Sequence, residues 1–187
     1  MERRAFLYFA GAALGAVACG PPRPTTAPKA EKFPAYGAAE AALFGDTIAE
    51  DFLGGERPQP IHEDERLFRR VERADSVFAA RITTVDRDSQ GDEGPHFSLT
   101  ALPVGPVLAG RAEETAVTLL VPPASASYSW VRSLETALVG RPLILFMKRY
   151  NDAGAARIHW HLEPDVLPVR MAVERAKLSR TTRKVTR

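Results

Sequence analysis

Two histidines and a glutamate alternate along one short segment, at His159, His161 and Glu163. If this segment is a β-strand, the three side chains project from the same face, because alternate residues of a strand do so. Two imidazoles and a carboxylate can bind Zn²⁺ and leave a fourth position for water, which is the arrangement of a catalytic zinc site. With His62 or His96 as an added ligand, this set predicts a metal-dependent hydrolase.

The same alternation has an explanation without a metal, and we favour it. Ile158, Trp160 and Leu162 occupy the positions in between and would point to a core, while the three polar side chains point to solvent. On this interpretation we expect no metal site, no cofactor and no catalytic residue.

Two glycine-containing loops resemble known ligand loops but depart at required positions. Asp86 to Asp92 begins like a calcium loop, but Phe97 stands where a bidentate glutamate belongs. Gly105 to Ala112 has the glycine spacing of a phosphate-binding loop, but Arg111 and Ala112 replace the lysine and the magnesium-binding hydroxyl. We therefore expect a solvated hairpin loop at the first segment and a turn between two strands at the second.

Hydrophobic periodicity predicts the elements that position these residues. Helices are expected where apolar residues recur every three or four positions, at 38–52, 63–74, 127–139 and 169–178. Strands are expected where β-branched or alternating apolar residues occur, at 76–86, 96–102, 115–121, 143–147 and 157–162. His159 and His161 thus fall in the last of the expected strands.

From residue 76 the expected order is strand, strand, strand, helix, strand, strand, which is the order of an OB-fold. We therefore predict a mixed α+β domain, built on a small five-stranded OB-like antiparallel barrel with flanking helices. A small β-sandwich is the alternative. Four aromatic residues would either fill the core of the domain or line a groove for an oligosaccharide or peptide, and we favour the core. They are Tyr128, Trp130, Tyr150 and Trp160.

Length and composition limit the chain to one globular domain. Its 187 residues are 45% hydrophobic and 26% charged, which argues against wholesale disorder and against a polytopic membrane protein. The chain has one cysteine, Cys19, and a single cysteine cannot form an internal disulfide.

The first twenty residues have the pattern of an export signal. Arg3 and Arg4 precede an uncharged run at 5–18, which is short for a membrane span and suits the apolar region of a signal peptide. The run ends in Ala16-Val17-Ala18-Cys19-Gly20, which resembles the lipobox of bacterial lipoproteins, with Ala16 where that family prefers leucine. The resemblance implies cleavage before Cys19 and a lipid group on its sulfur.

This resemblance implies a domain order and a location. A signal peptide (1–18) is followed by the lipidated cysteine and a proline-rich tether (19–37), one globular domain (38–178) and a basic tail (179–187). Because acyl chains on Cys19 would anchor the chain without spanning the bilayer, we expect a bacterial cell-envelope protein that faces the periplasm or the exterior. Arg3-Arg4-Ala5-Phe6-Leu7 also resembles the core of a twin-arginine signal, so both export routes stay open.

Charge is uneven along the chain. Residues 170–187 carry seven basic side chains and one acidic side chain, a sum of +6, while residues 19–169 sum to −5. The basic tail would contact anionic lipid headgroups or extend as a solvated end, and we favour the solvated end.

Two function classes remain. We favour a non-catalytic binding or structural module, tethered to membrane lipid through Cys19 and contacting an envelope protein, peptide or glycan. The alternative is the zinc hydrolase built on His159, His161 and Glu163. The basic tail and the OB-like order would also suit a cytoplasmic protein that binds nucleic acid. That interpretation requires the first nineteen residues not to be an export signal, so no nucleic-acid partner is expected.

Overall fold

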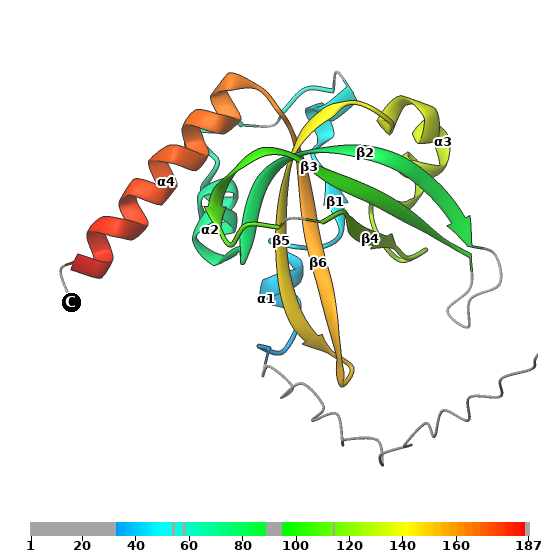
Figure 1. Ribbon diagram of the computed structural model, residues 1–187, viewed down its shortest axis with the longest axis horizontal. Coiled ribbons are helices and arrows are strands. Elements are labelled where there is room, and N and C mark those ends of the chain that lie inside the picture. The colour runs from blue at the N-terminus through cyan, green and yellow to red at the C-terminus, as the bar shows by residue number, and fades with distance from the viewer. Residues whose placement is uncertain (1–32, 54, 58, 89–94, 114, 186–187) are drawn as a thin grey trace, which may run out of the picture. The chain divides into compact units, whose positions relative to one another are not determined.

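The computed structural model describes residues 33–53, 55–57, 59–88, 95–113 and 115–185 (Figure 1). Cys19, the predicted signal and most of the predicted tether lie outside these residues. The helical elements are α1 (Ala38–Ala41), η1 (Glu50–Leu53), η2 (Ile61–Glu63), α2 (Glu65–Arg73), α3 (Tyr128–Leu138) and α4 (Leu167–Val185). The strands are β1 (Thr47–Ile48), β2 (Ser76–Asp88), β3 (His96–Gly110), β4 (Val117–Val121), β5 (Pro142–Asp152) and β6 (Ala155–Pro164).

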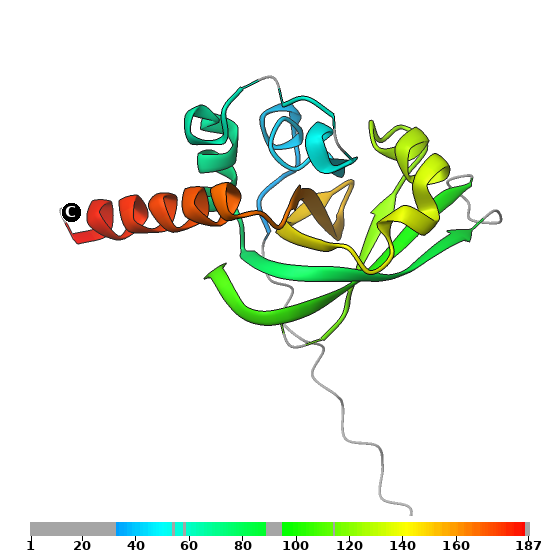
Figure 2. The same cartoon turned by 90° about the horizontal axis from the view of Figure 1, so that it is seen from above.

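The strands form one curled sheet in the order β1-β6-β5-β2-β3-β4 (Figure 2). The mixed α+β class is confirmed. The five expected strands pair antiparallel, but the count of five was wrong, because the two residues of β1 pair parallel with β6 and add a sixth strand. Three register shifts interrupt the β2–β3 pairing, and such irregularities bend and twist a strand pair.

The concave side of the sheet encloses the larger apolar core. Its largest buried side chains include Trp160 from β6, Phe97 from β3 and Phe78 from β2. The indole Nε1 of Trp160 donates a hydrogen bond to the carbonyl oxygen of Leu120 at 3.1 Å, which ties β6 to β4 at the far end of the sheet order. The curl thus brings strands that do not pair into contact through a core side chain.

A second apolar core lies on the opposite side of β5, beneath α2 and α4. Ile144 and Phe146 of β5 point into it, whereas Leu143, Leu145 and Met147 point into the first core. Because both faces of β5 are covered, its sequence has a continuous run of apolar residues at 143–147 instead of an alternation of apolar and polar residues.

The expected helix over 38–52 was wrong. Only the single turn of α1 forms, and the chain then passes through Gly45 and through Asp46 at φ 54° into β1. A Cβ at Gly45 would lie 2.7 Å from the carbonyl oxygen of Ala41, so the close turn requires glycine. Phe44 and Phe52 also enter different cores, which one straight helix would not allow.

The remaining elements lie where the periodicity placed them, with one further exception. The expected turn at 105–112 is largely strand, since β3 runs on to Gly110, which pairs with Ser76. Pro103 and Pro106 are tolerated there for two reasons. β4 pairs with β3 only from Phe97 to Ala101, so both prolines lie beyond that pairing, and register shifts interrupt the hydrogen bonding of β3 with β2. In the part of the chain that the structure describes, no helix is long and apolar enough to cross a membrane.

Candidate functional site

The outer face of β6 is buried instead of solvent-exposed. His159, His161 and Glu163 alternate with core residues as expected, but they are only 7%, 5% and 1% exposed. The prediction that they face solvent was therefore wrong. Its cause is long-range, because β1 pairs with this strand at His161 and Leu162 and brings Asp46 and Thr47 against the two histidines.

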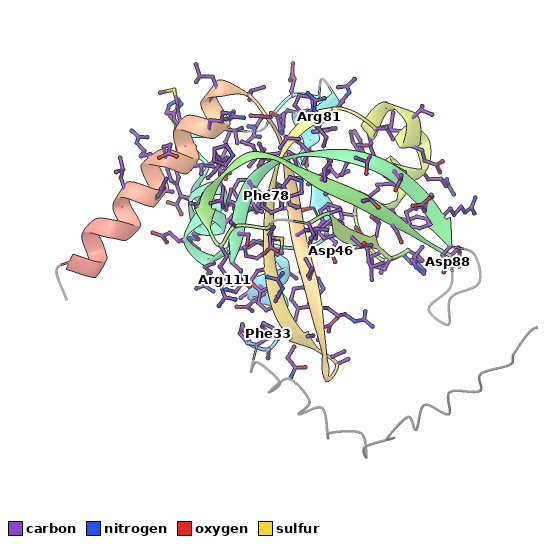
Figure 3. All side chains as sticks on the ribbon, in the orientation of Figure 1. Phe33, Asp46, Phe78, Arg81, Asp88 and Arg111 are labelled. Atoms are coloured by element: carbon purple, nitrogen blue, oxygen red, sulfur yellow. The ribbon has the colours of Figure 1, made fainter. Side chains whose placement is uncertain are left out.

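Asp46 holds the first of the two histidines. Asp46 is labelled in Figure 3. Its Oδ2 lies 2.9 Å from His159 Nδ1, and its Oδ1 accepts a hydrogen bond from the backbone N–H of Trp160 at 3.1 Å. Because a carboxylate only accepts, Nδ1 of His159 carries a proton. Burial raises the pKa of Asp46, and the contact with His159 opposes that rise.

Thr47 and Glu163 hold the second histidine. Thr47 Oγ1 lies 2.7 Å from His161 Nδ1, and His161 Nε2 lies 3.0 Å from Glu163 Oε1. The carboxylate must accept, so Nε2 carries the proton and the threonine hydroxyl donates to Nδ1. Burial lowers the pKa of His161, helped by the positive charge of Arg70, so the ring is neutral at neutral pH.

Glu163 is in turn neutralised by two arginines. Arg57 Nη2 donates to Glu163 Oε2, and Arg70 Nη1 lies 3.6 Å from Glu163 Oε1. Burial would raise the pKa of Glu163, but the hydrogen bond from His161 and the charge of Arg57 lower it below its usual range. The carboxylate is therefore ionised although it is almost fully buried.

Each arginine has further partners that fix it. Arg57 also pairs with Asp51 and Asp64, at 3.0 Å and 3.3 Å. Arg70 Nε donates to the carbonyl oxygen of Leu43 at 2.8 Å. Asp64 also caps α2, accepting from the backbone N–H groups of Arg66 and Leu67, and Arg70 is buried on the same helix together with Leu67 and Val71.

This ionic cluster forms the floor of a cavity of about 540 Å³. Residues between 41 and 59, residues of α2 and residues at the start of α3 line it. Trp130, 41% exposed, lies at the cavity together with Arg66 and Glu50. A second hollow of about 570 Å³ shares Ala42, Gln59, Asp64 and Arg66 with the first, so the two adjoin over α2.

Of the predicted zinc ligands, the structure brings together only His161 and Glu163, which contact each other. His159 contacts Asp46, while both ring nitrogens of His161 contact Thr47 and Glu163. His62 is exposed beside Glu63. His96 is the cross-strand partner of Asp88, where β2 ends and β3 begins. Among the described residues, no group of three or more His, Cys, Asp or Glu side chains is placed to hold a metal ion.

The predicted aromatic set is divided by the structure. Tyr150 and Trp160 are buried, and Tyr128 packs against the larger core, as expected of core residues. Trp130 lies at the cavity, as expected of the groove alternative.

Several cavity residues were missed by sequence reasoning. Arg70 carried a usable clue, because it lies on the same helical face as Leu67 and Val71 and a charged residue on a buried face needs a partner. Thr47 and Arg57 carried none, since their roles depend on contacts with residues more than a hundred positions away.

Comparisons with protein-family models, with curated proteins and with solved structures found no match. Arguments about function therefore depend on the residues and geometry of this cavity.

Proposed function

We propose that the protein is a lipid-anchored module of the bacterial cell envelope that binds a glycan segment in the cavity over β6. The anchor is the predicted acyl group on Cys19. The body is proposed to be an OB-like barrel with β1 added. The strand order β4-β3-β2-β5-β6, with α3 between β4 and β5 in the chain, supports this, since it is the order of that barrel opened between β4 and β6.

The observation that carries the proposal is the pre-organised floor of the cavity. Its side chains already have hydrogen-bond partners within the protein, namely those of His161, Glu163, Arg57 and Arg70. A ligand would therefore meet a fixed surface, and these side chains would lose little conformational entropy when it binds. A catalytic acid or base, in contrast, needs an atom available to the substrate.

The lining favours a polar ligand without strong net charge. Arg57, Arg66 and Arg70 face Glu50, Asp51, Asp64 and Glu163, so the cavity is close to neutral. Trp130 offers an aromatic surface on which a sugar ring can stack, and small side chains such as Ala42, Ala49 and Ala126 leave room beside it. The adjoining hollow favours an extended ligand over a compact one.

Calorimetry of the purified protein with soluble N-acetylglucosamine oligosaccharides tests this function. We expect binding that Trp130→Ala or Arg66→Ala weakens, whereas Arg132→Ala leaves it unchanged. Arg132 is the matched control because it is an exposed arginine on α3 that does not line the cavity. Binding of a short neutral peptide in preference to the oligosaccharide, or binding that survives Trp130→Ala, would contradict the proposal.

The envelope location is tested by intact mass. Protein from the membrane fraction of the native host should have the mass of residues 19–187 plus acyl chains, and Cys19→Ser should abolish the modification. An unmodified chain that starts at Met1 and stays in the soluble fraction would contradict the anchor.

One observation favours a second candidate function, acyl transfer. A hydroxyl, an imidazole and a carboxylate that line the cavity are connected by hydrogen bonds, from Thr47 to His161 and from His161 to Glu163. This is the pattern of an activated nucleophile. The Thr47 oxygen would bond to a carbonyl carbon while its proton passes to His161 Nδ1. The bond from that carbon to the leaving group would then break, and the leaving group would take the proton from His161. Water would then hydrolyse the ester on Thr47.

Release of nitrophenol from p-nitrophenyl acetate measures this second candidate. Thr47→Ser should retain the activity and Thr47→Val should abolish it. If the parent, Thr47→Ser and Thr47→Val proteins all release nitrophenol only at the uncatalysed rate, the contacts of Thr47 have a structural role instead of a catalytic one. They would then stabilise the pairing of β1 with β6, because Thr47 and His161 are direct cross-strand partners.

A further inference from the structure

Helix α4 has one face packed on the body and one face exposed. Val169, Ala172, Val173 and Ala176 are buried in the second core, against residues of α2 and β5. On the same helix Leu167, Met171 and Leu178 are 70%, 63% and 67% exposed. These are the three most exposed large apolar side chains recorded in the described part of the chain.

The three exposed side chains form a single stripe. At about 100° per residue, Leu167, Met171 and Leu178 lie within about 40° of one another around the helix axis. Glu174 lies about 20° outside this arc, and it pairs with Lys177. We call Leu167, Met171 and Leu178 the apolar stripe of α4.

Basic residues flank the apolar stripe on both sides. At about 100° per residue, Arg170 and Lys177 fall on one side of it and Arg175 on the other. Residues 170–187 as a whole sum to +6. An apolar stripe between basic flanks is the arrangement of helices that lie in the interface of an anionic membrane.

We propose that the apolar stripe of α4 rests on an anionic lipid surface and gives the protein a second membrane contact. This inference rests on the proposed anchor at Cys19 for proximity to a bilayer. Charge complementarity selects this occupant, because two copies of a segment with a charge of +6 would repel each other. Figure 2 shows α4 extending beyond the sheet, which leaves its outer face accessible to a flat surface.

A second contact would orient the body. A lipid anchor alone limits only the distance of a domain from the membrane, whereas a helix that lies in the interface also fixes the orientation of the domain. The cavity over β6 would then be presented at a constant angle to the surrounding envelope.

Vesicle co-sedimentation tests the proposal without the lipid anchor. The chain is residues 19–187 with Cys19→Ser, which retains the whole compact unit from Lys32 to Arg187. We expect binding to vesicles of phosphatidylcholine and phosphatidylglycerol in equal parts, at least about tenfold weaker binding to phosphatidylcholine alone, and loss of binding at high salt.

The stripe is tested by the double variant Met171→Glu with Leu178→Glu, which should weaken binding about tenfold. The matched control is Leu102→Glu with Leu120→Glu, two exposed leucines on β3 and β4, which should bind like the parent. Circular dichroism checks that each variant is folded.

Three results would overturn the proposal: no vesicle binding, equal binding to both vesicle types, or equal loss in the two double variants. A lipid-free dimer that the α4 variant dissociates would also overturn it, since a second copy would then cover the stripe. Because the tested chain carries no acyl group, these results are independent of whether Cys19 is lipidated.

Discussion

The ring of Tyr36 lies flat against the imidazole of His159, with centroids 3.6 Å apart and planes 3° apart. Its hydroxyl donates to the carbonyl oxygen of Phe44 at 2.8 Å, and its backbone N–H donates to Asn151 at 3.1 Å. Tyr36 falls within the predicted tether (19–37), so the last residues of that segment are attached to β5 and β6 before the chain reaches α1.

Substitutions at Tyr36 should separate the stacking contribution from that of the hydroxyl. We expect Tyr36→Phe to lower the free energy of unfolding by about 1 kcal/mol, because only the hydrogen bond to Phe44 is lost. Tyr36→Ala should lower it by about 2 kcal/mol, because the contact with His159 is lost as well. Urea denaturation measures both values, and equal losses would show that the stacked rings contribute nothing.

The buried ionic cluster should respond to the loss of one partner far more than a surface pair does. Glu163→Ala leaves Arg70 buried without its carboxylate, and we expect a loss of about 3 to 5 kcal/mol. Glu65→Ala is the matched control, because Glu65 pairs with Arg69 on the exposed side of α2 and should cost less than about 1 kcal/mol. Similar unfolding midpoints for the two variants would contradict the cluster's structural role.

Local patterns predicted the elements well. The apolar recurrence at 63–74 predicted α2, and the run at 143–147 predicted the buried strand β5. Both patterns depend on neighbours along the chain, so they could be read without the fold. The strand, strand, strand, helix, strand, strand order followed from such patterns.

The site depended on contacts between distant segments and could not be read in this way. The spacing of Phe44 and Phe52 predicted one helix, yet the two rings are buried in different cores. Nothing near His161 indicated that Thr47 would pair with it and close the outer face of β6. The histidines were located on the correct face of the strand, but the burial of that face was missed.

Two glycines with the same backbone conformation should tolerate alanine very differently. Gly110 and Gly140 have φ of 80° and 79°, but a Cβ at Gly110 would lie 2.1 Å from the carbonyl oxygen of Asp75, whereas a Cβ at Gly140 meets nothing within 4 Å. Gly140→Ala should cost about 1 kcal/mol from backbone strain alone. Gly110→Ala should cost about 3 kcal/mol or more, because β2 and β3 must separate. Thermal unfolding compares them, and equal shifts would contradict the close approach of β3 to Asp75.

Acid should destabilise the protein through His161, beginning below its ordinary pKa of 6.5. Burial and the charges of Arg70 and Arg57 lower the pKa of His161 in the folded state, with Glu163 opposing, so the unfolded chain takes up a proton first as the pH falls.

Glu163 acts in the same direction below its ordinary value of 4.5, because its pKa is also lowered. Asp46 acts in the opposite direction, since its raised pKa means that the folded protein takes up the proton first.

We therefore expect the free energy of unfolding to fall between about pH 7 and pH 5, with a slope of at most about 1.4 kcal/mol per pH unit for one proton. His161→Gln should flatten this slope, whatever its effect on stability at pH 7, because the slope reports only the difference in bound protons. His62→Gln is the control, as the side chain of His62 is exposed on η2. If His161→Gln and His62→Gln retain the slope of the parent protein, His161 is not the group whose protonation destabilises the fold.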